Sequence, residues 1–181
     1  MSIYLASQKP SLHRLSDLLW QIPVILRTRG WYAHSALIFG EPGKNAICFS
    51  ANRSQGVLFG TCDTTDGSWD HIKLTMNDQQ EAYAQNLASE LTGSGYGIDD
   101  IKKYLWPAET DNIDTYDCSN VVATILARDS YPLGVTEKNC WLLSPSRLHE
   151  IILGVEERYR TLAKENSSTS TFVANKNRNE N

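Results

Sequence analysis

Residues 31–53 read WYAHSALIFGEPGKNAICFSANR, and this stretch decides the fold. Two apolar runs, residues 31–40 and 46–53, have the composition of β-strands. The segment between them, EPGKN, supplies the proline, glycine and asparagine that are typical of a turn. The stretch therefore predicts a β-hairpin and, with it, an antiparallel sheet.

The neighbouring segments extend this sheet and add helices. Short strands are expected over residues 2–6, 56–59 and 69–74. Apolar spacing and capping signals predict helices over 11–27 (kinked by Pro23), 77–91, 98–105, 119–128 and 144–162. The strands form a block flanked by helices, without regular βαβ alternation, so the expected class is α+β with an antiparallel sheet.

Composition limits the class of protein. Of 181 residues, 41% are apolar and 21% charged, which is ordinary for a globular protein. The net charge of −4 lacks the basic excess that general nucleic-acid binding needs. The longest aliphatic run, residues 22–26, is far shorter than the ~20 residues of a membrane span. The first residues do not resemble a secretory signal, so a cytoplasmic location is expected.

The patterned part of the chain ends near residue 165. We expect one domain over residues 1–165 and a disordered polar tail over 166–181, which reads NSSTSTFVANKNRNEN. The four cysteines, Cys48, Cys62, Cys118 and Cys140, show neither a CxxC pair nor zinc-ligand spacing. A chain of this size does not need a disulfide framework, and no export signal is recognised, so we expect reduced thiols. No metal and no cofactor are expected.

Cys118 is the cysteine whose position suggests chemistry. The segment YDCSNVVATILA runs from an acidic loop into a helical pattern, so Cys118 is expected at the amino end of a helix. The helix dipole and free N–H groups there lower a thiol pKa and favour the nucleophilic thiolate. The alternative is that Cys118 is a small buried hydrophobe.

A thiolate nucleophile needs a general base, and His34 is the best candidate. It lies early in the apolar strand of residues 31–40, where packing can orient its ring, although a histidine there can also be a satisfied core residue. His13, His71 and His149 have the sequence context of solvated surface residues.

Several pieces, taken in chain order, resemble the circularly permuted papain-like hydrolases, which are relatives of the NlpC-type cell-wall peptidases. Between about residues 3 and 152 these pieces are LAS, RTRGWYAHSALIF, CFSANRSQGV, WDHIKL, GYG, CSNVVA and WLLSPSRL. The most similar branch contains bacterial YiiX and YaeF proteins and many short phage and prophage proteins. Lecithin:retinol acyltransferase is a more distant member.

The resemblance implies a permuted papain-like fold and assigns roles to four residues. Cys118 would be the nucleophile and His34 the general base. Ser50, on the following strand, would orient the imidazole, and Tyr96 in the GYG turn would lie near the oxyanion site. The backbone N–H of Cys118 would be a second oxyanion donor.

The implied function is that of a cysteine hydrolase, an amidase, peptidase or esterase, that forms an acyl-enzyme on cell-wall peptides or lipid-linked acyl groups. Ala36 and Asn120 stand where many relatives have acids. These departures motivate the alternative of an inactive binding module of the same fold. A thiol-dependent acyltransferase is a further alternative. No nucleic-acid partner is expected, and the sequence does not define the oligomeric state.

Overall fold

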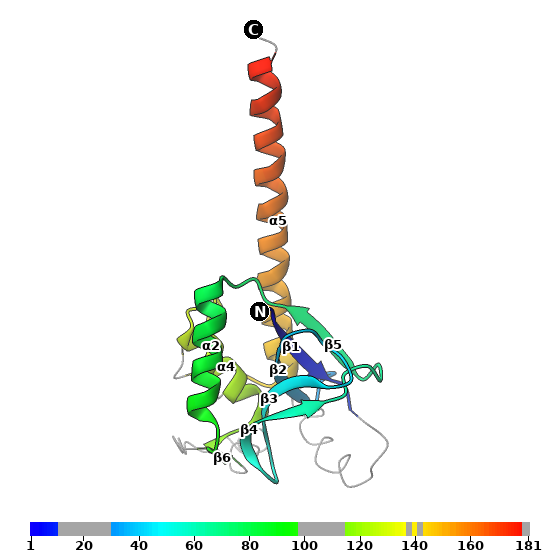
Figure 1. Cartoon of the computed structure of the whole chain (residues 1–181), viewed down its shortest axis with the longest axis vertical. Coiled ribbons are helices and arrows are strands. Elements are labelled where there is room, and N and C mark those ends of the chain that lie inside the picture. The colour runs from blue at the N-terminus through cyan, green and yellow to red at the C-terminus, as the bar shows by residue number, and fades with distance from the viewer. Residues whose placement is uncertain (11–29, 98–114, 137–138, 141–142, 179–181) are drawn as a thin grey trace.

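The fold of this α+β protein is built on an antiparallel sheet of five strands (Figure 1). In the computed structural model the described residues are 1–10, 30–97, 115–136, 139–140 and 143–178. The strands are β1 (Ile3–Gln8), β2 (His34–Phe39), β3 (Ala46–Asn52), β4 (Gly56–Cys62) and β5 (Trp69–Lys73). Their order across the sheet is β4-β3-β2-β1-β5, so the predicted hairpin is its β2–β3 unit.

Three helices accompany the sheet in the described part of the chain: α2 (Asp78–Leu91), α4 (Cys118–Arg128) and α5 (Pro145–Arg178). The predicted capping box of α2 is present, because Asn77 accepts from the N–H of Gln80 and the Gln80 side chain accepts from the N–H of Asn77. The predicted helices over 11–27 and 98–105 lie outside the described residues. Helix α5 continues through residues 166–178, for which composition predicts a disordered tail.

The two faces of the sheet have different surroundings. Leu37 and Phe39 of β2 point to the main core, where α4 packs against β2 and β3 and α5 packs against β1 and β5. Ala36 and Ile38 alternate with them and belong to a smaller apolar cluster on the other face. This second face is concave, because residues of both edge strands, β4 and β5, line the same cavity on it.

A disulfide links β3 to β4 on the concave face. Cys48 and Cys62 are bonded, with their Cα atoms 6.1 Å apart. The expectation of reduced thiols is therefore wrong for this pair, whereas Cys118 and Cys140 are free. The register explains the pairing: Cys62 lies opposite Ala46 and Cys48 opposite Gly60, so the two cysteines are diagonal neighbours on one face.

A second, two-stranded sheet carries the segment that enters α4. Strand β6 (Gly95–Tyr96) pairs in parallel with β7 (Thr115–Tyr116), and Tyr96 lies opposite Tyr116. We expected only a flexible turn around the GYG sequence. The short pairing brings Tyr96 beside the residues that immediately precede Cys118.

Candidate functional site

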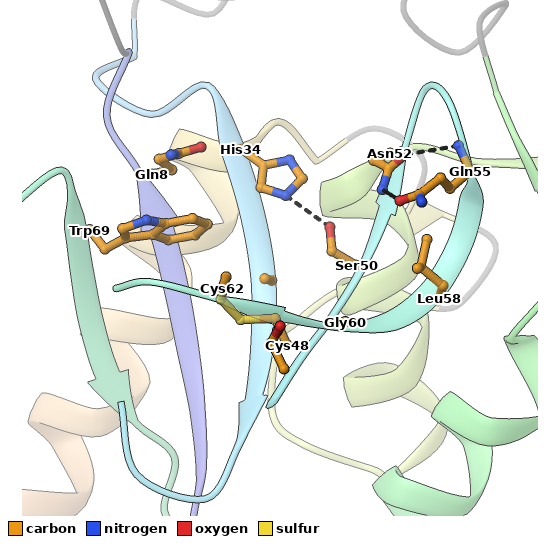
Figure 2. Close-up of a pocket in the computed structure, with 12 residues that line it drawn as sticks. Gln8, His34, Cys48, Ser50, Asn52, Gln55, Leu58, Gly60, Cys62 and Trp69 are labelled. Carbon is orange, nitrogen blue, oxygen red and sulfur yellow. Dashed lines mark hydrogen bonds between the residues drawn. A yellow bond between two sulfur atoms is a disulfide. The ribbon is translucent and has the colours of Figure 1, made fainter. Parts of the chain in front are cut away.

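A cavity of about 240 Å³ opens on the concave face of the sheet (Figure 2). We call it the His34 cavity. The side chains that line it within the described part of the chain carry no permanent charge. They are Gln8, His34, Ala36, Cys48, Ser50, Asn52, Gln55, Leu58, Gly60, Thr61, Cys62 and Trp69.

His34 and Ser50, two of the predicted site residues, meet in this cavity. The His34 Nε2 lies 3.0 Å from the Ser50 Oγ, and Ser50 Oγ donates to the carbonyl oxygen of Ser35 at 3.0 Å. The hydroxyl has one hydrogen, and when it donates that hydrogen to the carbonyl it accepts from Nε2–H of the imidazole. This assignment leaves the His34 Nδ1 with a free lone pair, which is what a general base requires.

The His34 imidazole is neutral at physiological pH. Burial lowers its pKa to about 4, and the negative charge of Asp117 opposes that shift. The ring also makes an edge contact with Trp69, with centroids 6.0 Å apart. His34 is therefore a half-buried base whose proton affinity depends on how much water reaches it.

Cys118 is the first residue of α4, and Asp117 caps that helix. The Asp117 carboxylate accepts from the backbone N–H of Asn120 at 2.7 Å and from the Ser119 hydroxyl at 3.0 Å. The Cys118 sulfur accepts hydrogen bonds from the backbone N–H groups of Ser35, Ser119 and Cys118 itself, and each of these bonds favours a thiolate. The backbone of Ser35 thus links the two groups, since its N–H contacts Cys118 and its carbonyl oxygen accepts from Ser50.

Burial nevertheless dominates the titration of Cys118. Burial, and to a smaller extent the Asp117 charge, raise the pKa of the thiol to about 12, because the backbone donors only partly compensate. The lowered thiol pKa expected from the helix terminus is therefore wrong for this state of the protein, because Cys118 is only 7% exposed. In the described part of the chain no hydrogen bond joins Cys118 to His34.

Asp117 and Tyr96 complete the surroundings of Cys118. The Asp117 charge acts on both His34 and Cys118, so this carboxylate lies near both groups. Sequence reasoning treated Asp117 as part of a solvated acidic loop and missed this position, although its place directly before a helix is an N-cap signal. Tyr96 is half-buried against the main core and neighbours the chain two residues before Cys118.

A second polar cluster, which the sequence analysis did not anticipate, lies between the sheet and α5. We call Ser7, Tyr32, Asp70 and His149 the α5 cluster. The His149 Nδ1 lies 2.9 Å from the Ser7 Oγ, and its Nε2 lies 3.3 Å from the Tyr32 hydroxyl, which donates to Asp70 at 2.6 Å. The rings of Tyr32 and His149 stack with centroids 4.2 Å apart.

The expected surface positions of two histidines are wrong. His149 is buried in the α5 cluster, and burial lowers its pKa while Asp70 opposes that shift. His71 is half-buried on β5, and its Nε2 is a buried nitrogen without a hydrogen-bond partner. His13 lies outside the described residues. The sequence context of His149, beside Glu150 in a helix, indicated a solvated surface residue, but its side chain turns toward the sheet and contacts Ser7.

The described part of the chain contains neither a candidate metal site nor a candidate membrane span. No group of three or more His, Cys, Asp or Glu side chains in this part of the chain could hold a metal ion. None of the helices in the described ranges is sufficiently long and apolar to cross a bilayer. No known protein-family model and no curated protein matches the chain.

Proposed function

We propose that this protein is a cysteine hydrolase with a permuted papain-like fold, in which Cys118 is the nucleophile and His34 the general base. The observation that carries the proposal is the hydrogen bond between His34 and Ser50, which leaves the His34 Nδ1 free at the same end of β2 that contacts the Cys118 sulfur. The Ser35 N–H that meets the Cys118 sulfur directly follows His34 in β2, and a positioned imidazole that acts on a thiol at a helix start is the arrangement that nucleophilic thiol catalysis uses.

The reaction starts from a neutral thiol and a neutral imidazole. The proton of Cys118 passes to the His34 Nδ1 as the sulfur attacks a substrate carbonyl, and the new C–S bond forms a tetrahedral oxyanion. The intermediate then expels an amine or alcohol, which takes the proton from His34. Water next attacks the thioester with His34 again as base, and the acid and free Cys118 are released.

Ser50, Asp117 and Tyr96 support these steps in the proposal. Ser50 holds the imidazole by accepting from Nε2–H, whether the ring is neutral or protonated. The Asp117 charge stabilises the imidazolium that forms during the reaction. Tyr96 and the backbone N–H of Cys118 are the proposed oxyanion donors.

The proposal is tested by acylation of Cys118 with p-nitrophenyl acetate. We expect peptide mass spectrometry to find one acetyl group on Cys118, and none on Cys140, which is a buried free thiol that donates to the Thr136 carbonyl. Acetylation should slow strongly in His34→Ala. Absence of acetyl-Cys118, or an unchanged rate in His34→Ala, contradicts the proposal.

A specific observation favours the second candidate, an inactive binding module of the same fold. The pKa of Cys118 is raised to about 12 and that of His34 is lowered to about 4, so no thiolate–imidazolium pair is present at neutral pH. A binding module would retain full biological effect as Cys118→Ser. A hydrolase would lose it.

A further inference from the structure

The His34 cavity is built to hold an uncharged group. Of the described residues that line it, none carries a permanent charge, and its histidine is neutral because burial disfavours the protonated ring. The nearest carboxylate along β5, Asp70, is already engaged by Lys9 and Tyr32 in hydrogen bonds of 2.8 and 2.6 Å. A ligand charge in this cavity would therefore lose water without gaining a partner, which is costly.

The cavity instead offers carboxamides and an aromatic face. Trp69, Gln8 and His34 form a row across β5, β1 and β2, because Gln8 lies opposite both of the others in the sheet register. Asn52 and Gln55 lie across the cavity from Gln8 and Trp69, and the Asn52 Nδ2 donates to the Gln55 Oε1 at 3.1 Å (Figure 2). Within the described part of the chain the Gln8 carboxamide has no hydrogen-bond partner, so its donor and acceptor are both open to a ligand.

The size of the cavity limits what enters. Its volume of about 240 Å³ is below the ~300–1,000 Å³ of pockets that enclose drug-sized ligands. The lining contains few large apolar side chains besides Leu58 and Trp69. A long acyl chain would need a longer and more apolar channel, whereas a single amide-bearing group of residue size fits both the volume and the lining.

We propose that the His34 cavity binds a short, uncharged, amide-bearing group, and that it selects against carboxylates, phosphates and long-chain acyl groups. Gln8 and Gln55 would exchange hydrogen bonds with the amide, and Trp69 would cover its flat face. That this group belongs to the substrate of the thiol rests on the proposed function. The binding itself does not, because Cys118 does not line the cavity.

The test compares two probes of nearly equal shape, N-acetylglycinamide and N-acetylglycine, which differ in an amide against a carboxylate. Binding is followed through the side-chain amide signals of Gln8 and Gln55 and the indole N–H signal of Trp69 in ¹H–¹⁵N spectra. We expect saturable shifts with a dissociation constant of roughly 1–10 mM for the neutral probe, the range that so few atoms support. The carboxylate should bind at least about tenfold more weakly.

Matched variants locate the binding. Gln8→Glu introduces a carboxylate into the cavity and should weaken the neutral probe about tenfold, whereas Gln85→Glu makes the same change on the exposed side of α2 and should leave binding unchanged. If Gln8→Glu does not fold, Gln55→Glu provides the same test at an exposed turn. Equal binding of both probes, stronger binding of the carboxylate, or no saturation by the neutral probe overturns the proposal.

The two proposals can fail separately. Binding of N-acetylglycinamide should persist in Cys118→Ala, which removes the thiol and leaves the cavity lining intact. If the amide binds but Cys118 is never acetylated, the ligand class stands and the hydrolase proposal falls. If Cys118 is acetylated but the neutral amide does not bind, the hydrolase proposal stands and the ligand class falls.

Discussion

Two histidine–serine pairs lie on opposite faces of one sheet, and their nitrogen–oxygen distances are nearly equal. His34 lies 3.0 Å from Ser50 on the concave face, and His149 lies 2.9 Å from Ser7 on the helix face. Their surroundings differ: the first pair lines a cavity, whereas Ser7 is fully buried beneath α5.

The pairs also differ in how many ring nitrogens are used. Tyr32 donates its proton to Asp70, so it accepts from His149 Nε2–H, and Ser7 then donates to Nδ1. Both nitrogens of His149 are therefore occupied, while His34 Nδ1 has no hydrogen-bond partner among the described residues. A histidine with a free nitrogen beside a cavity can transfer protons; a histidine with both nitrogens bonded holds elements together.

The largest expected effect comes from His34→Ala. Loss of the proposed general base should slow acetylation of Cys118 by p-nitrophenyl acetate by about 10²–10⁴-fold, the usual contribution of such a group. The free energy of unfolding, measured by urea denaturation, should change much less, because the ring borders a cavity. Comparable rates in wild type and His34→Ala would remove the functional distinction between the two pairs.

His149→Ala should produce the opposite pattern. It removes a buried ring and the hydrogen bond of the Ser7 hydroxyl, while Tyr32 keeps its bond to Asp70, so we expect a loss of about 3 kcal/mol in stability. For a chain of this size the melting temperature should fall by roughly 6–12 °C. Acetylation of Cys118, measured well below the melting temperature, should be nearly unchanged; a strong loss there would give the α5 cluster a catalytic role.

Acid should destabilise the protein through both histidines. Burial lowers the pKa of His149, and lowers that of His34 to about 4, so the unfolded chain binds protons that the folded chain does not. Their contribution is complete above about pH 6.5; that of His34 is lost as the pH falls toward 4, and that of His149 is lost as the pH falls below 6.5 through its lowered pKa. In His149→Gln the slope of unfolding free energy against pH in this window should decrease by up to ~1.4 kcal/mol per unit. An unchanged slope would show that the pKa of His149 is the same in the folded and the unfolded protein.

The smallest effects are expected from the two serines. Ser50→Ala removes the acceptor of the His34 Nε2–H and should slow acetylation of Cys118 about tenfold, since one hydrogen bond of ~1.4 kcal/mol orients the base. Ser7→Ala should leave that rate unchanged and cost about 1 kcal/mol of stability, measured by urea denaturation. If the two variants exchanged these effects, the assignment of the pairs would have to be reversed.

Local patterns predicted much of the fold and part of the site. The β2–β3 hairpin and the start of α2 depend on turn and capping residues that act within a few positions, and both are present. The pairing of β6 with β7 joins short segments far apart in sequence, which leaves no periodic signal. The Cys48–Cys62 disulfide also leaves no signal in the sequence, because strand register, not spacing, brings these residues together.

The direction of the Cys118 pKa shift could not be predicted from sequence. A helix start predicts a lowered thiol pKa, but the outcome depends on how deeply the sulfur is buried, and burial is set by packing against β2. His149 illustrates the same limit. Its neighbours in sequence indicated the surface, while Ser7 and Tyr32, more than a hundred residues away, determine its environment.

The position of β1 between β2 and β5 in the sheet has a consequence for synthesis on the ribosome. β1 is made before every strand that it pairs with, and its second neighbour, β5, is complete only when Lys73 has been added. Until then the nascent chain presents a strand with an unpaired edge, the kind of segment that associates with other chains. During translation the protein should therefore depend on chaperones most while the segment between β1 and β5 is emerging.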